Sequence, residues 1–467
     1  MRFGKTAGAA ATYVILASLQ RSVSLLILPF VTHAMPLSEY GAASILASAS
    51  LLITALVATP LVQLIIRAAA RGGEDAPALL RASGLYCYYV VPAVAAAVAM
   101  GFALLVTEFL GVSGRIWAIE ILAIGFQPSA STFALWVAQA REDLNRFATI
   151  STTSVLVAAA SKLVFVVVLH LGVFGWAVSD LLSAVLTAVL ASALVRLPRA
   201  TITAPHMRYF LHFTLPLIPH SISLWALTFL SRPAMAIVTT LEQVGLFAFG
   251  LNIAQVAGLI LAEANRAALP RYSRECLPAP TGETMGIVRW QIIGALLVPG
   301  IIGSGLALTG PWIFAEAYWP SFAITAILLL SQLAFGLYLV PMNYLTQSAG
   351  LPRYSSLASG AGAIVILLTI AIFGQRYGAF GVACGTVAAY AVMAVTAMWL
   401  TFTQHLPIAW RAWLSSWPEI GTASAGFACS ILALSLPVGS KLSQSSAMAC
   451  LAMMFVATRL TARRADA

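Results

Sequence analysis

The sequence predicts an all-α polytopic membrane protein of about 14 transmembrane helices, in which a parallel repeat builds two six-helix lobes and two extra helices follow. Three observations predict this fold: the composition, the regular succession of apolar segments, and an internal duplication. Hydrophobic residues make up 61% of the chain, charged residues only 9%, and the mean hydropathy is +0.94. A chain of this composition requires a bilayer rather than water as its solvent.

The apolar segments are each about 20 residues long, which matches the thickness of the hydrocarbon layer. The first of them follows the charged stretch "MRFGKTAGAA" and is too long for the apolar region of a signal peptide, so we expect it to be a retained helix. Connections are short, so no soluble domain is expected. The predicted spans are 9–30, 42–66, 82–106, 116–138, 148–170, 173–196, 209–230, 243–264, 287–308, 322–345, 356–373, 378–401, 419–437 and 445–459.

The basic residues predict the orientation of these spans. Most of the 25 Lys and Arg residues fall in connections that share one side with the N-terminus. Because basic loops stay in the cytoplasm, both termini are predicted to be cytoplasmic and the number of spans to be even. The residues on the other side are Arg115, Arg232, Arg376 and Lys441, whereas Arg21 and Lys162 lie within spans.

A duplication divides the chain. "LSEYG" at 37–41 recurs as "LEQVG" at 241–245, "LNRF" at 144–147 as "LPRY" at 351–354, and "GVFGWA" at 172–177 as "GAFGVA" at 378–383. The copies are about 205 residues apart in each case, which indicates one shared register. The predicted domains are an N-lobe at 1–204, a C-lobe at 205–405 and additional helices at 406–467. Two parallel repeats of six spans imply lobes related by an axis along the membrane normal, with a substrate path between them.

Four stretches resemble one known family. They are "LLILPFVTHAMPLSEYGAASILASASLL" with "IIRAAARG", and "YFLHFTLPLIPHSISLWALTFLSR" with "VGLFAFGLNIAQVAGLILAEANRAALPRYSR". These stretches resemble the polysaccharide (O-antigen type) flippases of the multidrug/oligosaccharidyl-lipid/polysaccharide exporter superfamily. The resemblance implies a bacterial inner-membrane transporter that moves polyprenyl-diphosphate-linked oligosaccharide to the periplasmic leaflet by alternating access, for lipopolysaccharide or exopolysaccharide biosynthesis. The chain departs from the family at Ser231, where members often carry an acid before the arginine of the seventh span.

Charged residues within the spans are the candidate site residues, because each costs about 3 kcal/mol or more to insert. Arg21 lies near the middle of the first span and is either satisfied within the protein or faces a cavity, where its planar fork suits the diphosphate of the cargo. Lys162 and Asp180 lie at matching depths, so they form either a structural ion pair or a cavity pair in which Asp180 exchanges a coupling ion. Glu120 and Glu263 lie close to span ends and are expected to be solvated. The full set of predicted cavity residues is Arg21, Lys162, Asp180, Gln20, Gln63, Gln255 and Arg232.

Other functional classes fit less well. A polytopic enzyme of polysaccharide assembly usually has a large extramembrane loop or an acidic constellation, and neither occurs here. A cation-coupled multidrug exporter of the same superfamily is the closer alternative, although acidic rather than basic residues are expected in its cavity. The scattered cysteines show no metal-ligand spacing, so no cofactor is expected beyond coupling to H⁺ or Na⁺. The expected partners are lipid-linked oligosaccharide, membrane lipid and a polysaccharide polymerase complex. Nucleic acid is excluded, because the arginines are dispersed between apolar runs.

Overall fold

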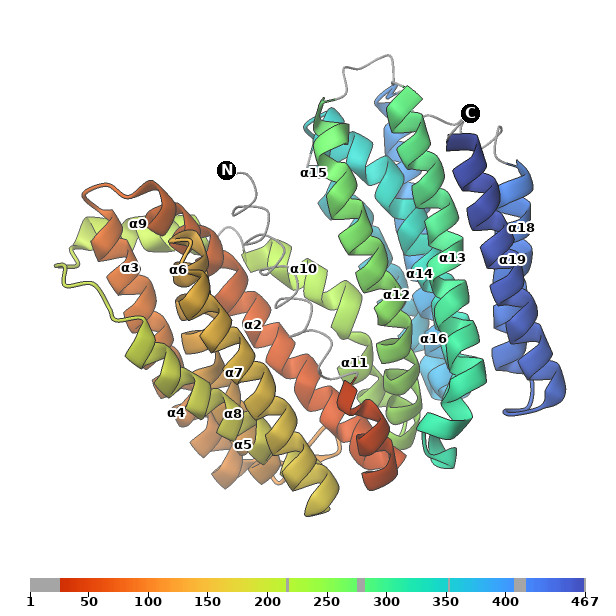
Figure 1. Ribbon diagram of the computed structural model, residues 1–467. Coiled ribbons are helices and arrows are strands. Elements are labelled where there is room, and N and C mark those ends of the chain that lie inside the picture. The colour runs from red at the N-terminus through yellow and green to blue at the C-terminus, as the bar shows by residue number, and fades with distance from the viewer. Residues whose placement is uncertain (1–25, 216–217, 275–281, 352, 407–416, 466–467) are drawn as a thin grey trace. The chain divides into compact units, whose positions relative to one another are not determined.

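The computed structural model describes residues 26–465 except 216–217, 275–281, 352 and 407–416 (Figure 1). The chain divides into two compact units, Met1–Ala236 (unit 1) and Ile237–Ala467 (unit 2). The predicted boundary between the repeated lobes, at residues 204 and 205, therefore does not coincide with the division between compact units. The segment 205–236 belongs to unit 1 by its contacts.

Unit 1 is built from long helices, several of which contain a wider π-helical turn, and one short antiparallel hairpin. After helical residues 26–34, its elements are α2 (Leu37–Arg71), α3 (Ala76–Leu85), η1 (Tyr86–Val90), α4 (Val91–Leu105), β1 (Glu108–Phe109), β2 (Val112–Ser113), α5 (Gly114–Pro128), η2 (Ser129–Ala134), α6 (Leu135–Ala140), α7 (Leu144–Lys162), η3 (Leu163–Val168), α8 (Gly172–Leu194), α9 (Ala204–Thr214), α10 (Ile218–Phe229) and the start of α11 (Ser231–Val238).

Unit 2 contains the end of α11 and the rest of the chain. Its further elements are α12 (Leu241–Arg274), α13 (Gly282–Ile313), η5 (Glu316–Tyr318), α14 (Ser321–Asn343), η6 (Tyr344–Ser348), α15 (Arg353–Thr369), η7 (Ile370–Gly374), α16 (Gln375–Thr403), α18 (Trp417–Ser435) and α19 (Lys441–Ala465). The two last helices pack against each other and against α13 (Figure 1).

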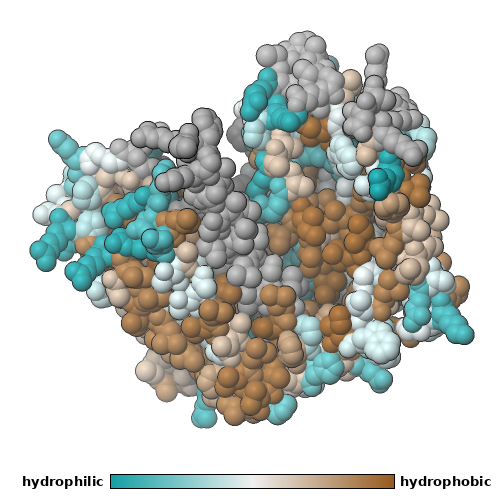
Figure 2. Space-filling view, in the orientation of Figure 1, coloured by the Kyte–Doolittle hydropathy of each residue, from teal (hydrophilic) through white to brown (hydrophobic). Residues whose placement is uncertain are grey.

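The membrane-spanning character of the chain is confirmed. Ten helical stretches in the described part are long and apolar enough to cross a bilayer, and one of them, Arg353–Thr403, turns back at Gly378 (φ 53°, ψ −136°). On unit 1, hydrophilic residues gather at the end formed by α3, α6 and α9, while apolar residues cover the helices below it (Figure 2). A chain of this kind is a multi-pass membrane protein.

The same packing occurs in both units, which supports the duplication seen in the sequence. In unit 1, α5 packs against α4 and α8, and α7 packs against α8. In unit 2, α14 packs against α13 and α16, and α15 packs against α16. The π-helical segments η3 and η7 end α7 and α15 at equivalent positions, so the repeat extends to local irregularities of the backbone.

The repeated motifs also make the same tertiary contact in the two units. Gly172 and Gly378 have positive φ angles of 55° and 53°, which glycine adopts without the steric cost paid by other residues. The carboxylate of Glu39, from "LSEYG", lies directly against Gly172. Its counterpart Gln243, from "LEQVG", accepts a hydrogen bond of 2.9 Å from the backbone N–H of Ala379. Each motif therefore places a side-chain oxygen at the turn where the last span of its repeat begins.

The predicted seventh span, 209–230, differs from a single helix. It contains the C-terminal part of α9 and all of α10, and α11 begins directly after it. Each of these three helices carries a proline in its first turn: Pro205, Pro219 and Pro233. Proline lacks the N–H needed to continue a helix and is tolerated at helix starts, which explains the breaks. The indole N–H of Trp225 donates to the backbone oxygen of Ser48, at 2.9 Å, and this bond joins α10 to α2.

Candidate functional site

Three helices of unit 1 bring charged residues together inside the membrane-spanning region. α8 packs against both α5 and α7, and the hydroxyl of Ser161 on α7 donates to the backbone oxygen of Ser179 on α8 at 3.3 Å. Small residues allow such close approach between helices in a bilayer. Glu120 on α5, Lys162 on α7, and Trp176 and Asp180 on α8 form what we call the Lys162 cluster.

The structure shows Lys162 and Asp180 as an ion pair, which is one of the two arrangements that their matching depths left open. The Nζ atom of Lys162 lies 3.0 Å from Oδ1 of Asp180, and the side chains are 12% and 25% exposed. The same ammonium lies 3.9 Å from the ring centre of Trp176, within the range of a cation–π interaction. Lys162 is therefore held by a carboxylate and an aromatic face. A direct contact of either residue with cargo remains a prediction.

The expectation for Glu120 was wrong. Its side chain is buried, with 1% exposed, whereas the position of Glu120 near a predicted span end had suggested solvation. The reason is that α5 starts at Gly114 and packs against α8, so Glu120 lies more than one turn inside the helix and faces Lys162 and Asp180. The sequence did contain a sign of this burial, because a single acid in an otherwise apolar run of a membrane protein is a candidate functional residue. Glu263, in contrast, forms an exposed ion pair with Arg266 at 2.6 Å, as expected for a solvated carboxylate.

The other predicted cavity residues are dispersed. Arg21 and Gln20 lie outside the described residues. Gln63 on α2 is exposed, and Gln255 on α12 is partly buried. Arg232 at the start of α11 is only 4% exposed, and its guanidinium carbon lies 5.9 Å from the ring centre of Phe229. Of the predicted set, the described part of the chain thus brings together only Lys162 and Asp180.

Unit 2 contains an uncharged polar network that sequence reasoning had not assembled. Asn343 on α14 donates to Oδ1 of Asn265 on α12 at 2.6 Å, and the amide of Gln291 on α13 donates to the same oxygen at 2.7 Å. The hydroxyl of Tyr272 donates to Oε1 of Gln291. These bonds tie three helices together, and we call the four residues the amide network. The sequence contains these glutamine and asparagine residues, but it does not show that the faces of α12, α13 and α14 that carry them point toward one another.

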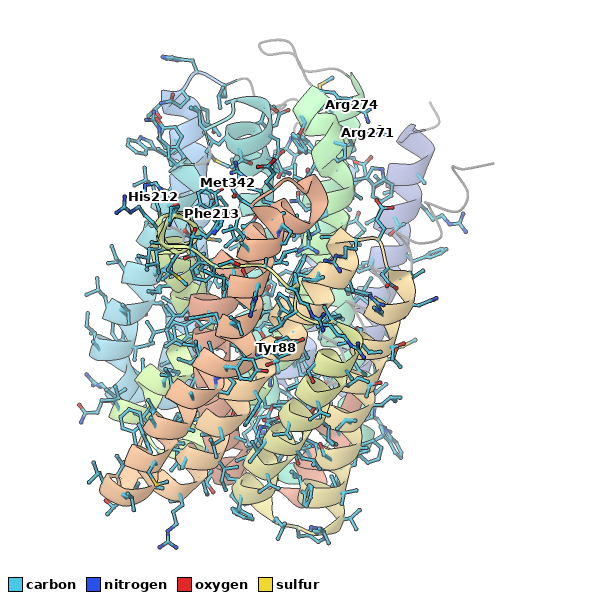
Figure 3. All side chains as sticks on the ribbon, turned by 90° about the vertical axis from the view of Figure 1, so that its left-hand side faces the viewer. Tyr88, His212, Phe213, Arg271, Arg274 and Met342 are labelled. Carbon is cyan, nitrogen blue, oxygen red and sulfur yellow. The ribbon has the colours of Figure 1, made fainter. Side chains whose placement is uncertain are left out.

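Basic residues lie at the end of α12, the helix that carries Asn265 and Tyr272 of this network. Arg271 and Arg274 are exposed and lie at the C-terminal end of α12 (Figure 3). Cations are favoured at this end of a helix, where backbone carbonyls lack intrahelical partners. In the described part of the chain, no group of three or more His, Cys, Asp or Glu residues is arranged to hold a metal ion.

Comparison with known proteins identifies the fold. No family model and no curated protein matches the chain. Among solved structures, the chain is similar to "Lipid II flippase MurJ, inward closed conformation", with a TM-score of 0.73 and 11% identity over 97% of this chain and 99% of that one. It is also similar to an inward-facing multidrug resistance MATE family transporter of the MOP superfamily, with a TM-score of 0.63 and 14% identity over 84% of this chain and 97% of that one. An outward-facing structure of such a transporter gives a TM-score of 0.51 and 18% identity over 85% and 95%.

These similarities establish the architecture. The chain shares its fold with these polytopic transporters, in agreement with the polytopic architecture that the repeat and the apolar segments predicted. The three structures named above are those of transporters. Identity is low in all three cases, so the cargo must be argued from the residues of this chain.

Proposed function

We propose that the chain is a flippase that moves polyprenyl-diphosphate-linked oligosaccharide across the bacterial inner membrane by alternating access, for lipopolysaccharide or exopolysaccharide biosynthesis. The observation that carries this proposal is the extent of the match to the lipid II flippase, which includes 97% of this chain and 99% of the other. The match to the inward-facing multidrug transporter leaves 16% of this chain without a counterpart. The shared length supports a lipid-linked cargo over a small drug.

The charges support an anionic cargo. The sequence places Arg21, Lys162 and Arg232 in or at the predicted spans, and the formal net charge of the chain is +10. Asp180 already neutralises Lys162, so we assign the diphosphate to Arg21 first and to Arg232 second. A guanidinium binds phosphate oxygens in bidentate fashion and keeps its charge when partly desolvated. The amides of Gln20, Gln63 and Gln255 are proposed to contact sugar hydroxyls, because an amide both donates and accepts hydrogen bonds.

Orientation and partners follow from the same proposal. The arginine-rich connections, including Arg271 and Arg274, are assigned to the cytoplasm together with both termini. They would attract the diphosphate of the cargo at the leaflet where it is made, since exposed arginines concentrate anionic ligands. A polysaccharide polymerase complex is the proposed partner on the periplasmic side.

The second candidate function is a cation-coupled multidrug exporter. The observation in its favour is the shared fold with the MATE family transporters, together with the buried acid Glu120 in unit 1. Its weakness is Arg21, a cation that the sequence places within a predicted span, where it would repel a cationic drug. The two candidates differ in the sign of the cargo, so an experiment can separate them.

The experiment uses cells depleted of the protein. We expect lipid-linked oligosaccharide to accumulate on the cytoplasmic leaflet, where a membrane-impermeant glycosidase added to spheroplasts cannot reach it. Restoring wild-type protein should move the saccharide to the accessible leaflet. Arg21→Ala should be present at wild-type abundance but fail to restore it, and Arg21→Lys should restore it in part, because a point charge lacks the bidentate fork. Unchanged leaflet distribution after depletion would refute the flippase proposal.

A further inference from the structure

We propose that Glu120 is a proton-binding site of the membrane-spanning region, and that its proton passes to Asp180 when Lys162 changes from one carboxylate to the other. The inference concerns what drives the protein rather than what it carries. It goes beyond the proposed function and holds for either candidate cargo.

The charged groups of the Lys162 cluster do not balance one another. The cluster has two carboxyl groups and one ammonium group, and Lys162 is engaged with Asp180 at 3.0 Å. If Glu120 were also ionised, the cluster would have one uncompensated negative charge in a low-dielectric region. An unpaired buried charge of this kind is avoided in proteins by taking up a proton or another cation. The cluster therefore holds one cation besides its own lysine.

The environment of Glu120 suits a proton better than a metal cation. Its side chain is 1% exposed, and its Oε2 atom has no hydrogen-bond partner among the described residues. A metal cation would need several oxygen ligands around this atom. No such set of acidic residues occurs in the described part of the chain. A proton needs only the carboxyl group, so the geometry favours the proton as the extra cation.

The groups that surround Glu120 come from several elements. Lys162 on α7 and Asp180 on α8 are the charged groups near enough to act on it. α4, which packs along α5, contains no titratable residue. Apart from Arg115 on α5 itself, the remaining titratable and charged groups with described side chains lie on α2, η1 and β1. They are Glu39, Tyr40, Arg67, Tyr86, Cys87, Tyr88, Tyr89 and Glu108. The lysine and the aspartate are thus the proton's immediate neighbours.

The proposed exchange conserves charge at every step. With Lys162 engaged by Asp180 as in the structure, the proposal assigns the proton to Glu120, while Lys162 and Asp180 are oppositely charged. When the ammonium moves to Glu120, the proton leaves that carboxyl and Asp180 accepts it, so the cluster stays neutral. Asp180 is 25% exposed and can release the proton to water, whereas the buried Glu120 cannot do so directly. The flexible lysine chain and the face of Trp176, 3.9 Å from the ammonium, favour this movement.

The test measures the protonation state of Glu120 in the purified full-length protein, without any cargo. Infrared spectra distinguish the C=O stretch of a protonated carboxylic acid from the bands of a carboxylate. We expect the difference spectrum between wild type and Glu120→Gln at neutral pH to show loss of a protonated-acid band. Glu108→Gln, which removes an exposed carboxylate of the β1 strand, is the matched control and should remove only carboxylate bands.

A second variant extends the test to the exchange. In Lys162→Met, the ammonium is missing, so Asp180 should also become protonated and a second protonated-acid band should appear. If Glu120→Gln instead removes a carboxylate band, Glu120 is ionised and the proposal is wrong. Loss of bound ²²Na⁺ in the same variant would then identify sodium as the cation of the cluster. A spectrum of Lys162→Met without the second band would overturn the exchange between the carboxyls. None of these results depends on the cargo, so they are separate from a failure of the flippase proposal.

Discussion

The last span of each repeat starts from the same kind of turn, but the residues along it differ in their chemistry. In unit 1, Glu39 meets Gly172 at the start of α8, and in unit 2, Gln243 meets Gly378 at the corresponding turn of α16. Further along these helices, Trp176 and Asp180 occupy the positions that Val382 and Thr386 occupy in unit 2. The predicted span 356–373, equivalent to the span of Lys162, has no charged residue at all.

The difference separates what the duplication must keep from what it can change. Backbone turns with positive φ depend on glycine, so both copies retain them. Interior side chains are free to diverge as long as their polar groups are satisfied. Unit 1 uses this freedom for a charged cluster, and unit 2 for the neutral amide network of Asn265, Gln291, Asn343 and Tyr272. A charged cluster can exchange a proton, whereas a saturated amide network holds helices together.

The largest expected effect comes from removing both acids of the charged cluster. Glu120→Gln combined with Asp180→Asn leaves Lys162 without a carboxylate, and we expect a loss of about 3 to 5 kcal/mol in the free energy of unfolding. Asp180→Asn alone should cost clearly less, because Glu120 can ionise and take over the ammonium. Unfolding in detergent, followed by thermal or denaturant titration, measures both. Thr386→Val, at the equivalent position of unit 2, is the control and should stay within about 1 kcal/mol of wild type.

A double variant as stable as wild type would contradict the contrast between the charged cluster of unit 1 and the neutral interior of unit 2. In that case Lys162 would not depend on the two carboxyls, and the charged cluster would be no different in kind from the neutral interior of unit 2.

An intermediate effect is expected at the two equivalent glycines. Gly172→Ala and Gly378→Ala each force a left-handed conformation on a residue with a Cβ atom, which costs about 1 to 2 kcal/mol, and the new Cβ would collide with Glu39 or Gln243. Both variants should therefore lose at least about this much stability in the same unfolding measurement. Gly421→Ala in α18, whose Cβ would meet nothing within 4 Å, should be neutral or slightly stabilising. An effect at only one of the two glycines would contradict their equivalence.

The smallest effect is expected in the amide network. Asn265→Leu removes the oxygen that accepts bonds from Asn343 and Gln291, but polar interactions between membrane helices average only about 0.6 kcal/mol. We expect a loss of about 1 kcal/mol, because two donors lose their acceptor. Gln255→Leu on the same helix serves as the matched control and should have less effect. Equal stability of the two variants would show that the network does not stabilise unit 2.

Much of the fold could be predicted because its causes are local. The apolar segments about 20 residues long and the basic bias of the loops can be read from the sequence without knowledge of tertiary contacts. The motifs around Glu39 and Gln243 revealed the repeat. The matching depths of Lys162 and Asp180 made an ion pair one of two possible arrangements, because opposite charges reduce each other's insertion cost, but depth does not say which helix faces meet. The burial of Glu120 was missed because it depends on which face of α5 meets α8. The succession of α9, α10 and α11 in and after the predicted seventh span was missed because hydropathy does not register the prolines in their first turns.

The central claim is that the chain moves an anionic lipid-linked saccharide, and reconstituted vesicles test it most directly. Wild-type protein is placed in liposomes containing a fluorescent polyprenyl-diphosphate oligosaccharide, and a membrane-impermeant quencher reports which leaflet it occupies. Parallel liposomes contain a cationic dye, the cargo type of the rival exporter. The account predicts that the protein moves the saccharide lipid between leaflets and leaves the dye distribution unchanged. Export of the dye with no movement of the saccharide lipid would contradict it.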